Sequence, residues 1–135
     1  MDHIENVGGW LLVPCAVLLL WQPAQFAVAA VMAMEAVAVR GAAVLVVLAA
    51  RLIVTAFGAA AGFAIMRKRQ AAIRLTIAVL LAAAAVDVFV ELTSFFPTNR
   101  VPGDAPYYAA ASAIVHGGLA VYMARSSRVR RTLTS

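Results

Sequence analysis

The stretch AAAAVDVFVELTSFF, residues 82–96, is apolar enough to lie in a lipid bilayer, and yet it contains two carboxylates, Asp87 and Glu91. The whole chain has the same apolar character. Of its 135 residues, 64% are hydrophobic and 13% are charged, whereas a soluble domain has roughly 25% charged residues. The charges also occur in short blocks between long neutral tracts, which leaves no polar face for a soluble helix. We therefore expect an integral membrane protein.

Four hydrophobic segments are each close to or above the ~20 residues that a membrane-spanning helix needs. They cover about residues 7–34, 41–66, 75–96 and 107–124. The sequence thus predicts an all-α, polytopic membrane protein, with one domain over residues 1–135 and four transmembrane helices in one bundle. As a straight helix the first segment would be roughly 42 Å long, against a hydrocarbon core of ~30 Å. We expect this helix to kink, or to end, at Pro23.

The basic residues predict the orientation of the chain. One block flanks the link between the second and third segments, a second block follows the fourth segment, and only Arg40 and Arg100 belong to the opposite side. Cytoplasmic loops are enriched in arginine and lysine. We therefore place that link and both termini in the cytoplasm, where these residues also attract anionic lipid headgroups. The two blocks are Arg67, Lys68, Arg69 and Arg74, and Arg125, Arg128, Arg130 and Arg131.

Three helices bring ionisable side chains to a similar depth. Counted from the outer helix ends, Arg51 lies about 15 Å deep, and Asp87 and His116 about 13 Å deep. Glu91 is one turn nearer the outside, at roughly 7 Å. Leaving such a group against lipid costs about 2.5–3.5 kcal/mol or more. The sequence therefore predicts an interior polar cluster in which Arg51 pairs with Asp87.

The helical spacing is consistent with this cluster. Arg51, Gly58 and Gly62 fall on one face of the second segment, and the two glycines allow another helix to approach closely. Two interpretations of the cluster remain open. In one, the charges only hold the helices in register, and Glu91 pairs with Arg40 or Arg100. In the other, one arginine cannot neutralise two carboxylates, so that a proton or a cation is held there.

Other kinds of site have little support in the sequence. A haem would need a second histidine within the spans, and the chain contains only His3 besides His116. No paired histidines or thiolates indicate a metal site, and the lone Cys15 is typical of packing. No catalytic motif is legible, so we expect no enzymatic activity, no cofactor and no metal. The basic residues adjoin apolar segments, which argues against nucleic-acid binding.

The two ends of the chain carry a family resemblance. Gly8-Gly9-Trp10-Leu11-Leu12 opens the first segment, and the chain closes with Ser127-Arg128-Val129-Arg130-Arg131-Thr132-Leu133. This pairing resembles the bacterial membrane family called domain of unknown function 2569. The closing motif departs from the family pattern at Ser127, Arg130 and Leu133. The resemblance implies four helices in a bacterial inner membrane, and it supplies no activity.

Two functions are compatible with these patterns. The first is a small non-enzymatic membrane protein that acts through helix contacts, as an accessory or structural subunit of a larger membrane complex or as a homo-oligomer. The alternative is a small transporter or proton-coupled permease that uses the cluster of Arg51, Asp87, Glu91 and His116.

Overall fold

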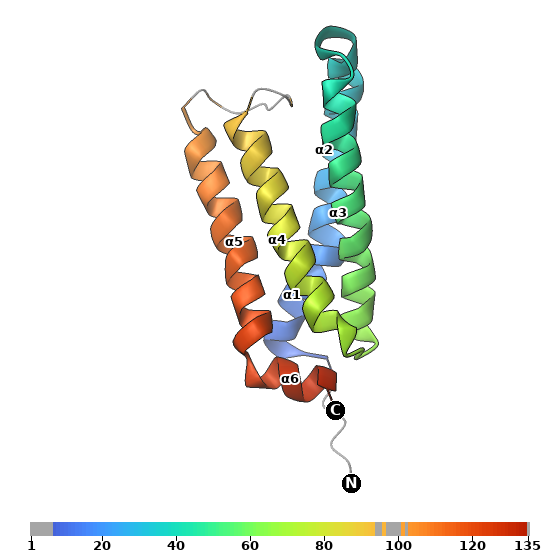
Figure 1. Cartoon of the computed structure of the whole chain (residues 1–135), viewed down its shortest axis with the longest axis vertical. Helices are drawn as coiled ribbons and strands as arrows, with labels where there is room; N and C mark the ends of the chain where they lie inside the picture. Colours follow the sequence, from blue (N-terminus) through green and yellow to red (C-terminus); the bar gives the residue numbers. More distant parts are fainter. Residues whose placement is uncertain (1–6, 94–95, 97–100, 102, 135) are drawn as a thin grey trace.

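The computed structural model describes residues 7–93, 96, 101 and 103–134, and the long elements in this part of the chain are all helices (Figure 1). The all-α fold predicted from the sequence is therefore confirmed. In chain order the elements are η1 (Gly9–Leu11), α1 (Leu12–Ala16), η2 (Val17–Trp21), α2 (Gln22–Arg40), α3 (Ala43–Met66), α4 (Ala71–Leu92), α5 (Ala105–Arg125) and α6 (Ser127–Thr134).

The first four elements form one uninterrupted apolar helix of 32 residues, Gly9–Arg40. Of the two expectations for Pro23, a kink or an end, the end is excluded, and the helix also continues beyond the expected boundary at residue 34 to Arg40. Its irregularity is the π-helical turn η2, which comes just before Pro23. A proline ring clashes with the carbonyl four residues earlier, here that of Leu19, and a wider turn relieves this clash. The helix therefore accommodates the proline by widening one turn.

The other helix ends differ from the expected ones by a few residues. Helix α3 begins two residues later than expected, α4 begins four residues earlier, and α5 extends slightly at both ends. Helix α4 stops at Leu92, and Phe96 lies outside it; residues 94 and 95 of the expected third helix lie outside the described residues. Gly41 makes the turn between α2 and α3 with a φ of 74°, which a glycine adopts without strain.

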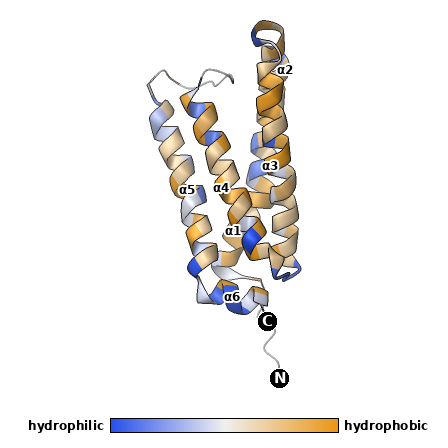
Figure 2. Ribbon diagram, viewed as in Figure 1, coloured by the Kyte–Doolittle hydropathy of each residue, from blue (hydrophilic) through white to orange (hydrophobic). Residues whose placement is uncertain are grey.

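Three helices in the described part of the chain are long and apolar enough to cross a membrane: Gly9–Arg40, Ala43–Met66 and Ala71–Leu92. The 21-residue α5 is not among them. Figure 2 shows hydrophobic residues along most of α2, α3 and α4, with hydrophilic residues gathered at α6 and at the turn between α3 and α4. This distribution is that of a membrane protein.

The helices pack in chain order, α2 on α3, α3 on α4 and α4 on α5. The α2–α3 pair extends beyond the ends of α4 and α5 (Figure 1). Gly62 sets the contact between α3 and the first helix, because a Cβ at this position would lie 2.6 Å from Cγ of Leu19. The absence of a side chain at Gly62 therefore allows the two helices to approach.

Gly62→Ala is expected to destabilise the protein by about 1–3 kcal/mol, since the added methyl group forces Leu19 or the whole first helix to move. Gly117→Ala on α5 is the matched control. Among the residues that the structure describes, none has an atom within 4 Å of a Cβ at Gly117, and alanine is favoured over glycine inside a helix by roughly 0.5–1 kcal/mol. Thermal unfolding of the purified proteins in detergent measures both changes. Equal melting temperatures for the two variants would contradict this account of the contact.

Helix α6 is not among the helices predicted from the sequence, because the arginines of this segment predict only the orientation of the chain. It lies across the end of the bundle at which the C-terminus is found (Figure 1). Val129 and Leu133 are fully buried and join an apolar cluster that includes Leu11, Leu80 and Met123. The basic side chains of α6 stay exposed: Arg128, Arg130 and Arg131. The helix is therefore a cap whose apolar face closes the core and whose basic face points outward.

Candidate functional site: a polar network facing a cavity

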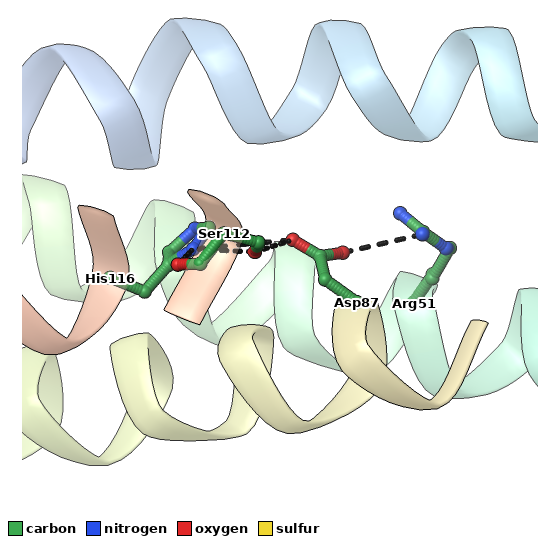
Figure 3. Close-up of polar contacts among 4 residues, drawn as sticks. All are labelled: Arg51, Asp87, Ser112 and His116. Carbon is green, nitrogen blue, oxygen red and sulfur yellow. Dashed lines mark hydrogen bonds and ion pairs between the residues drawn. The ribbon is translucent and has the colours of Figure 1, made fainter. Parts of the chain in front are cut away.

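Four polar side chains from three helices form a connected network (Figure 3). Nη2 of Arg51, on α3, lies 3.3 Å from Oδ1 of Asp87, on α4. The other carboxylate oxygen, Oδ2, accepts a hydrogen bond of 2.7 Å from the hydroxyl of Ser112, on α5. The structure thus brings together Arg51 and Asp87, the two residues that the sequence predicted as a pair. We call Arg51, Asp87, Ser112 and His116 the polar network.

His116 completes the network one helical turn along α5 from Ser112. Its Nδ1 lies 2.9 Å from the carbonyl oxygen of Ser112 and 3.1 Å from the hydroxyl oxygen. Because the hydroxyl donates its proton to Asp87, both of these oxygens act as acceptors toward the ring. Nδ1 must therefore carry a proton. His116 is 5% exposed, and its Nδ1 lies 4.0 Å from Oδ2 of Asp87.

Two further residues lie near the pair, Phe96 and Glu91. The guanidinium of Arg51 lies 5.9 Å from the centre of the Phe96 ring, within the range of a cation–π interaction. Glu91, one turn along α4 from Asp87, lines the same space as the network. Arg100, which the sequence offered as a partner of Glu91, lies outside the described residues.

The network borders a cavity of about 500 Å³ that lies between the first helix and the helices α3, α4 and α5. Figure 3 shows the ribbon of the first helix, in light blue, on the far side of the space that the four side chains face. All four residues of the polar cluster predicted from the sequence line this cavity. Its other lining residues include Trp21, Phe26, Val54, Val86, Tyr108 and Val115.

Gln22 is a polar residue of this cavity that sequence analysis missed. It is only 8% exposed, and neither its Nε2 nor its Oε1 has a hydrogen-bond partner among the described residues. The amide fits against Gly58, where any added Cβ would collide with Oε1. Gly58 was predicted as a helix-packing residue, and the structure shows that the space it leaves is taken by this amide. The sequence pattern does not mark Gln22 as a buried residue, because it adjoins Pro23, for which a kink or a helix end is predicted.

Gln22→Met is expected to raise the free energy of unfolding by about 1 kcal/mol, because an unpaired buried amide costs ~1–3 kcal/mol and methionine has a similar shape. The matched control is Gln25→Met, since Gln25 is exposed and lies on the same helix. The melting temperature in detergent measures the difference. A lower melting temperature for Gln22→Met than for Gln25→Met would mean that the amide is satisfied in the folded protein.

The polar network is not arranged as a metal centre. Among the residues that the structure describes, no three His, Cys, Asp or Glu side chains are grouped so as to hold a metal ion. Two residues that line the cavity have buried polar atoms without a hydrogen-bond partner among the described residues. These atoms are the donor Nε of Arg51, and the donor Nε2 and the acceptor Oε1 of Gln22.

The fold and the network together define an all-helical protein with membrane-type apolar helices and an interior polar site. The family model described as Protein of unknown function (DUF2569) matches residues 4–134. The chain therefore belongs to this family, as the motifs at its two ends indicated. Neither a search of curated proteins nor a search of solved structures finds a match to the chain.

Proposed function

We propose that the chain is a small solute transporter of the bacterial inner membrane, with four transmembrane helices and both termini in the cytoplasm. The fourth span is α5, which packs along α4 and, with 21 residues, is roughly 31 Å long. The exposed arginines of α6 and the basic turn between α3 and α4 support a cytoplasmic position for that end of the bundle. They also suit contact with anionic lipid headgroups. We propose no enzymatic step.

One observation carries the transport proposal: the polar network faces a cavity. An ion pair that only held helices in register would be expected to be packed on every side. Here the side chains of Arg51 and Asp87 are 17% and 28% exposed, and both line the cavity. Charged groups that border a cavity within a membrane commonly mark the path of an ion or a solute. The cavity size also falls in the ~300–1,000 Å³ range of small-molecule sites.

Reconstitution of the purified protein into liposomes tests this proposal. We expect a solute from a broad panel to accumulate in the vesicles, and its flux to be lost in Asp87→Asn, for which cooperative unfolding in detergent verifies that the variant is folded. The matched control is Arg74→Gln, at an exposed position on α4. Normal flux in Asp87→Asn, or no flux across the panel, would refute transport through this site.

A second function, as an accessory subunit or a homo-oligomer, is favoured by the α2–α3 pair. This pair extends beyond the rest of the bundle, and it exposes several large apolar side chains: Val31, Met34, Val39 and Val46. Such a surface suits another transmembrane helix. Purification in mild detergent followed by mass spectrometry should then recover a stoichiometric membrane partner or a second copy. A monodisperse monomer would exclude this function.

The proposed orientation predicts different accessibility for the two ends of the bundle. In a Cys15→Ser background, we expect Val101→Cys to react with a membrane-impermeant maleimide applied to intact cells. Thr134→Cys should react only after the membrane is permeabilised. Both positions are exposed in the structure. Labelling of Thr134→Cys in intact cells would invert the orientation.

A further inference from the structure

The cavity has an open side between the first helix and α5. Residues of both helices line the cavity. The first helix packs on α3 and α5 packs on α4, but the described parts of the first helix and α5 share little contact with each other. Figure 1 accordingly shows α2 and α5 on opposite sides of α4. We call this open side, with Trp21 on one edge and Val115 on the other, the gap.

The gap indicates which class of solute reaches the cavity. Resting on the transport function and the four spans proposed above, we infer that the solute is a lipophilic molecule with a hydrogen-bonding end, and that it enters the cavity from the bilayer through the gap.

The first step of the argument is the level of the gap. Val115 is the central residue of α5, ten residues from Ala105 and ten from Arg125. At 1.5 Å per residue it lies about 15 Å from each end of the helix. A hydrocarbon core is ~30 Å thick, so this edge of the gap lies near the middle of the bilayer. The neighbours of the gap at this level are acyl chains rather than water.

The second step is the character of the edges. Trp21 and Val115 both line the cavity, and they are 57% and 52% exposed. Each side chain therefore borders the cavity and the surroundings of the protein at once. A lipophilic molecule passes between such edges without losing hydrogen bonds, whereas a hydrated polar solute would lose its water there. The edges thus favour a solute that is already dissolved in the bilayer.

The third step is the polar network inside. Arg51 and Asp87 line the cavity and keep part of their side-chain surface exposed, and Ser112 lines it beside them. Ligand sites of this kind are mostly apolar, with a few polar groups that fix the orientation of the ligand. We therefore expect the apolar body of the solute to lie between the edges of the gap, and its hydrogen-bonding end to contact the network.

The size of the cavity favours a small molecule over the transmembrane helix of a partner. The lining residues of α5 run from Tyr108 to His116, about 12 Å along the helix axis. A helix of that length and ~10 Å in diameter occupies roughly 900 Å³, whereas the cavity has about 500 Å³. A slender single-chain molecule fits this space, and a helix does not.

Tryptophan fluorescence tests the inference, because Trp10 and Trp21 are the two tryptophans of the chain. In the full-length Trp10→Phe protein, reconstituted into liposomes, Trp21 reports on the edge of the gap. The probes are ω-bromoundecanol and ω-bromopropanol, which share a hydroxyl end and a bromine atom that quenches tryptophan but differ in the length of the apolar body. We expect the long alcohol to quench Trp21 with saturation as its content in the bilayer rises. The short alcohol should show no saturable quenching.

A reporter on another face controls for probe that is merely dissolved in the bilayer. Phe63→Trp, in a Trp10→Phe and Trp21→Phe background, places the reporter at an exposed position of α3 that does not line the cavity. Quenching by ω-bromoundecanol should rise there without saturation. Equal saturation at both reporters would show that the probe binds outside the cavity and would overturn the inference.

Variants of α5 locate the bound molecule. Ala111 is exposed and lines the cavity, so that Ala111→Phe places a ring in the space of the solute. It should weaken the saturable quenching of Trp21 by at least about tenfold in affinity. Ala113→Phe is the matched control, since Ala113 is exposed on the same helix but is not a lining residue. Unchanged affinity in Ala111→Phe would contradict binding in the cavity.

Competition tests the hydrogen-bonding end. At equal content in the bilayer, unbrominated undecanol should displace the probe at least about tenfold more effectively than undecane, which has no hydroxyl group. Equal displacement by the two molecules would remove the role assigned to the polar network in binding.

The outcomes separate this inference from the transport function. Saturable quenching by ω-bromopropanol alone would overturn the lipophilic solute and leave the transport proposal intact. Absence of saturable quenching by both alcohols, in a protein that unfolds cooperatively, would also overturn the inference, and the liposome flux assay then decides on transport independently. Saturable binding of ω-bromoundecanol in a protein without flux would retain the lipophile site and refute transport.

Discussion

Replacing Arg51 alone with leucine is expected to lower the free energy of unfolding by about 2–3 kcal/mol, because Asp87 is then left without its counter-charge. Breaking a fully buried ion pair costs ~3–5 kcal/mol. The smaller value applies here because both side chains keep some contact with the cavity. The change should appear as a lower melting temperature in detergent and as reduced abundance in the membrane.

The double variant Arg51→Leu with Asp87→Leu is the decisive comparison. Removal of both charges leaves no uncompensated ion, so stability should recover to within about 1 kcal/mol of the starting protein, as for other buried pairs replaced by apolar residues. The recovered protein should nevertheless show no solute flux. If the double variant is as unstable as Arg51→Leu, the pair is not the source of the loss and Arg51 stabilises the fold in another way.

Val129→Asp is expected to have the second large effect, a loss of about 3 kcal/mol or more, since it places an unpaired charge in a fully buried apolar cluster. The α6 cap should detach from the bundle. Limited proteolysis after Arg125 would report this detachment, and thermal unfolding would report the loss of stability.

Arg130→Asp provides the control for α6. It introduces the same side chain one residue further along the helix, on its exposed face. Its effect on stability should stay within about 0.5 kcal/mol, as is usual for surface positions. If the variants Val129→Asp and Arg130→Asp were cleaved by trypsin at equal rates, burial of Val129 would not be what holds α6 on the end of the bundle.

Much of the site was predictable because a bilayer restricts where charges are placed. The sequence predicts Arg51, Asp87 and His116 at similar depths on three segments. Because an isolated charge against lipid has a high free-energy cost, contact among these side chains is the arrangement of lower free energy. Helical spacing then placed Gly58 and Gly62 on the face of α3 that carries Arg51. In the structure, both glycines lie against the first helix.

The parts that were not predictable depend on contacts between segments distant in sequence. The sequence does not show which residue of the first helix faces Gly58. That residue, Gln22, is set by the turn η2, which the sequence does not predict. The sequence contains only a weak pattern that indicates the α6 cap. Val129, Thr132 and Leu133 follow helical spacing in a stretch otherwise rich in arginine, but so short a pattern is indistinguishable from chance without knowledge of the core it covers.

The π-helical turn at Val17–Trp21 has a consequence for the register of everything after it. Such a turn is equivalent to a one-residue insertion into a regular helix, and it rotates the following residues by about 100°. Deleting one residue within the turn would restore ordinary helical winding, and Gln22 would rotate about the helix axis away from Gly58. The amide would then meet acyl chains, so the position of a single surplus residue determines whether the first helix contributes a polar group to the bundle interior.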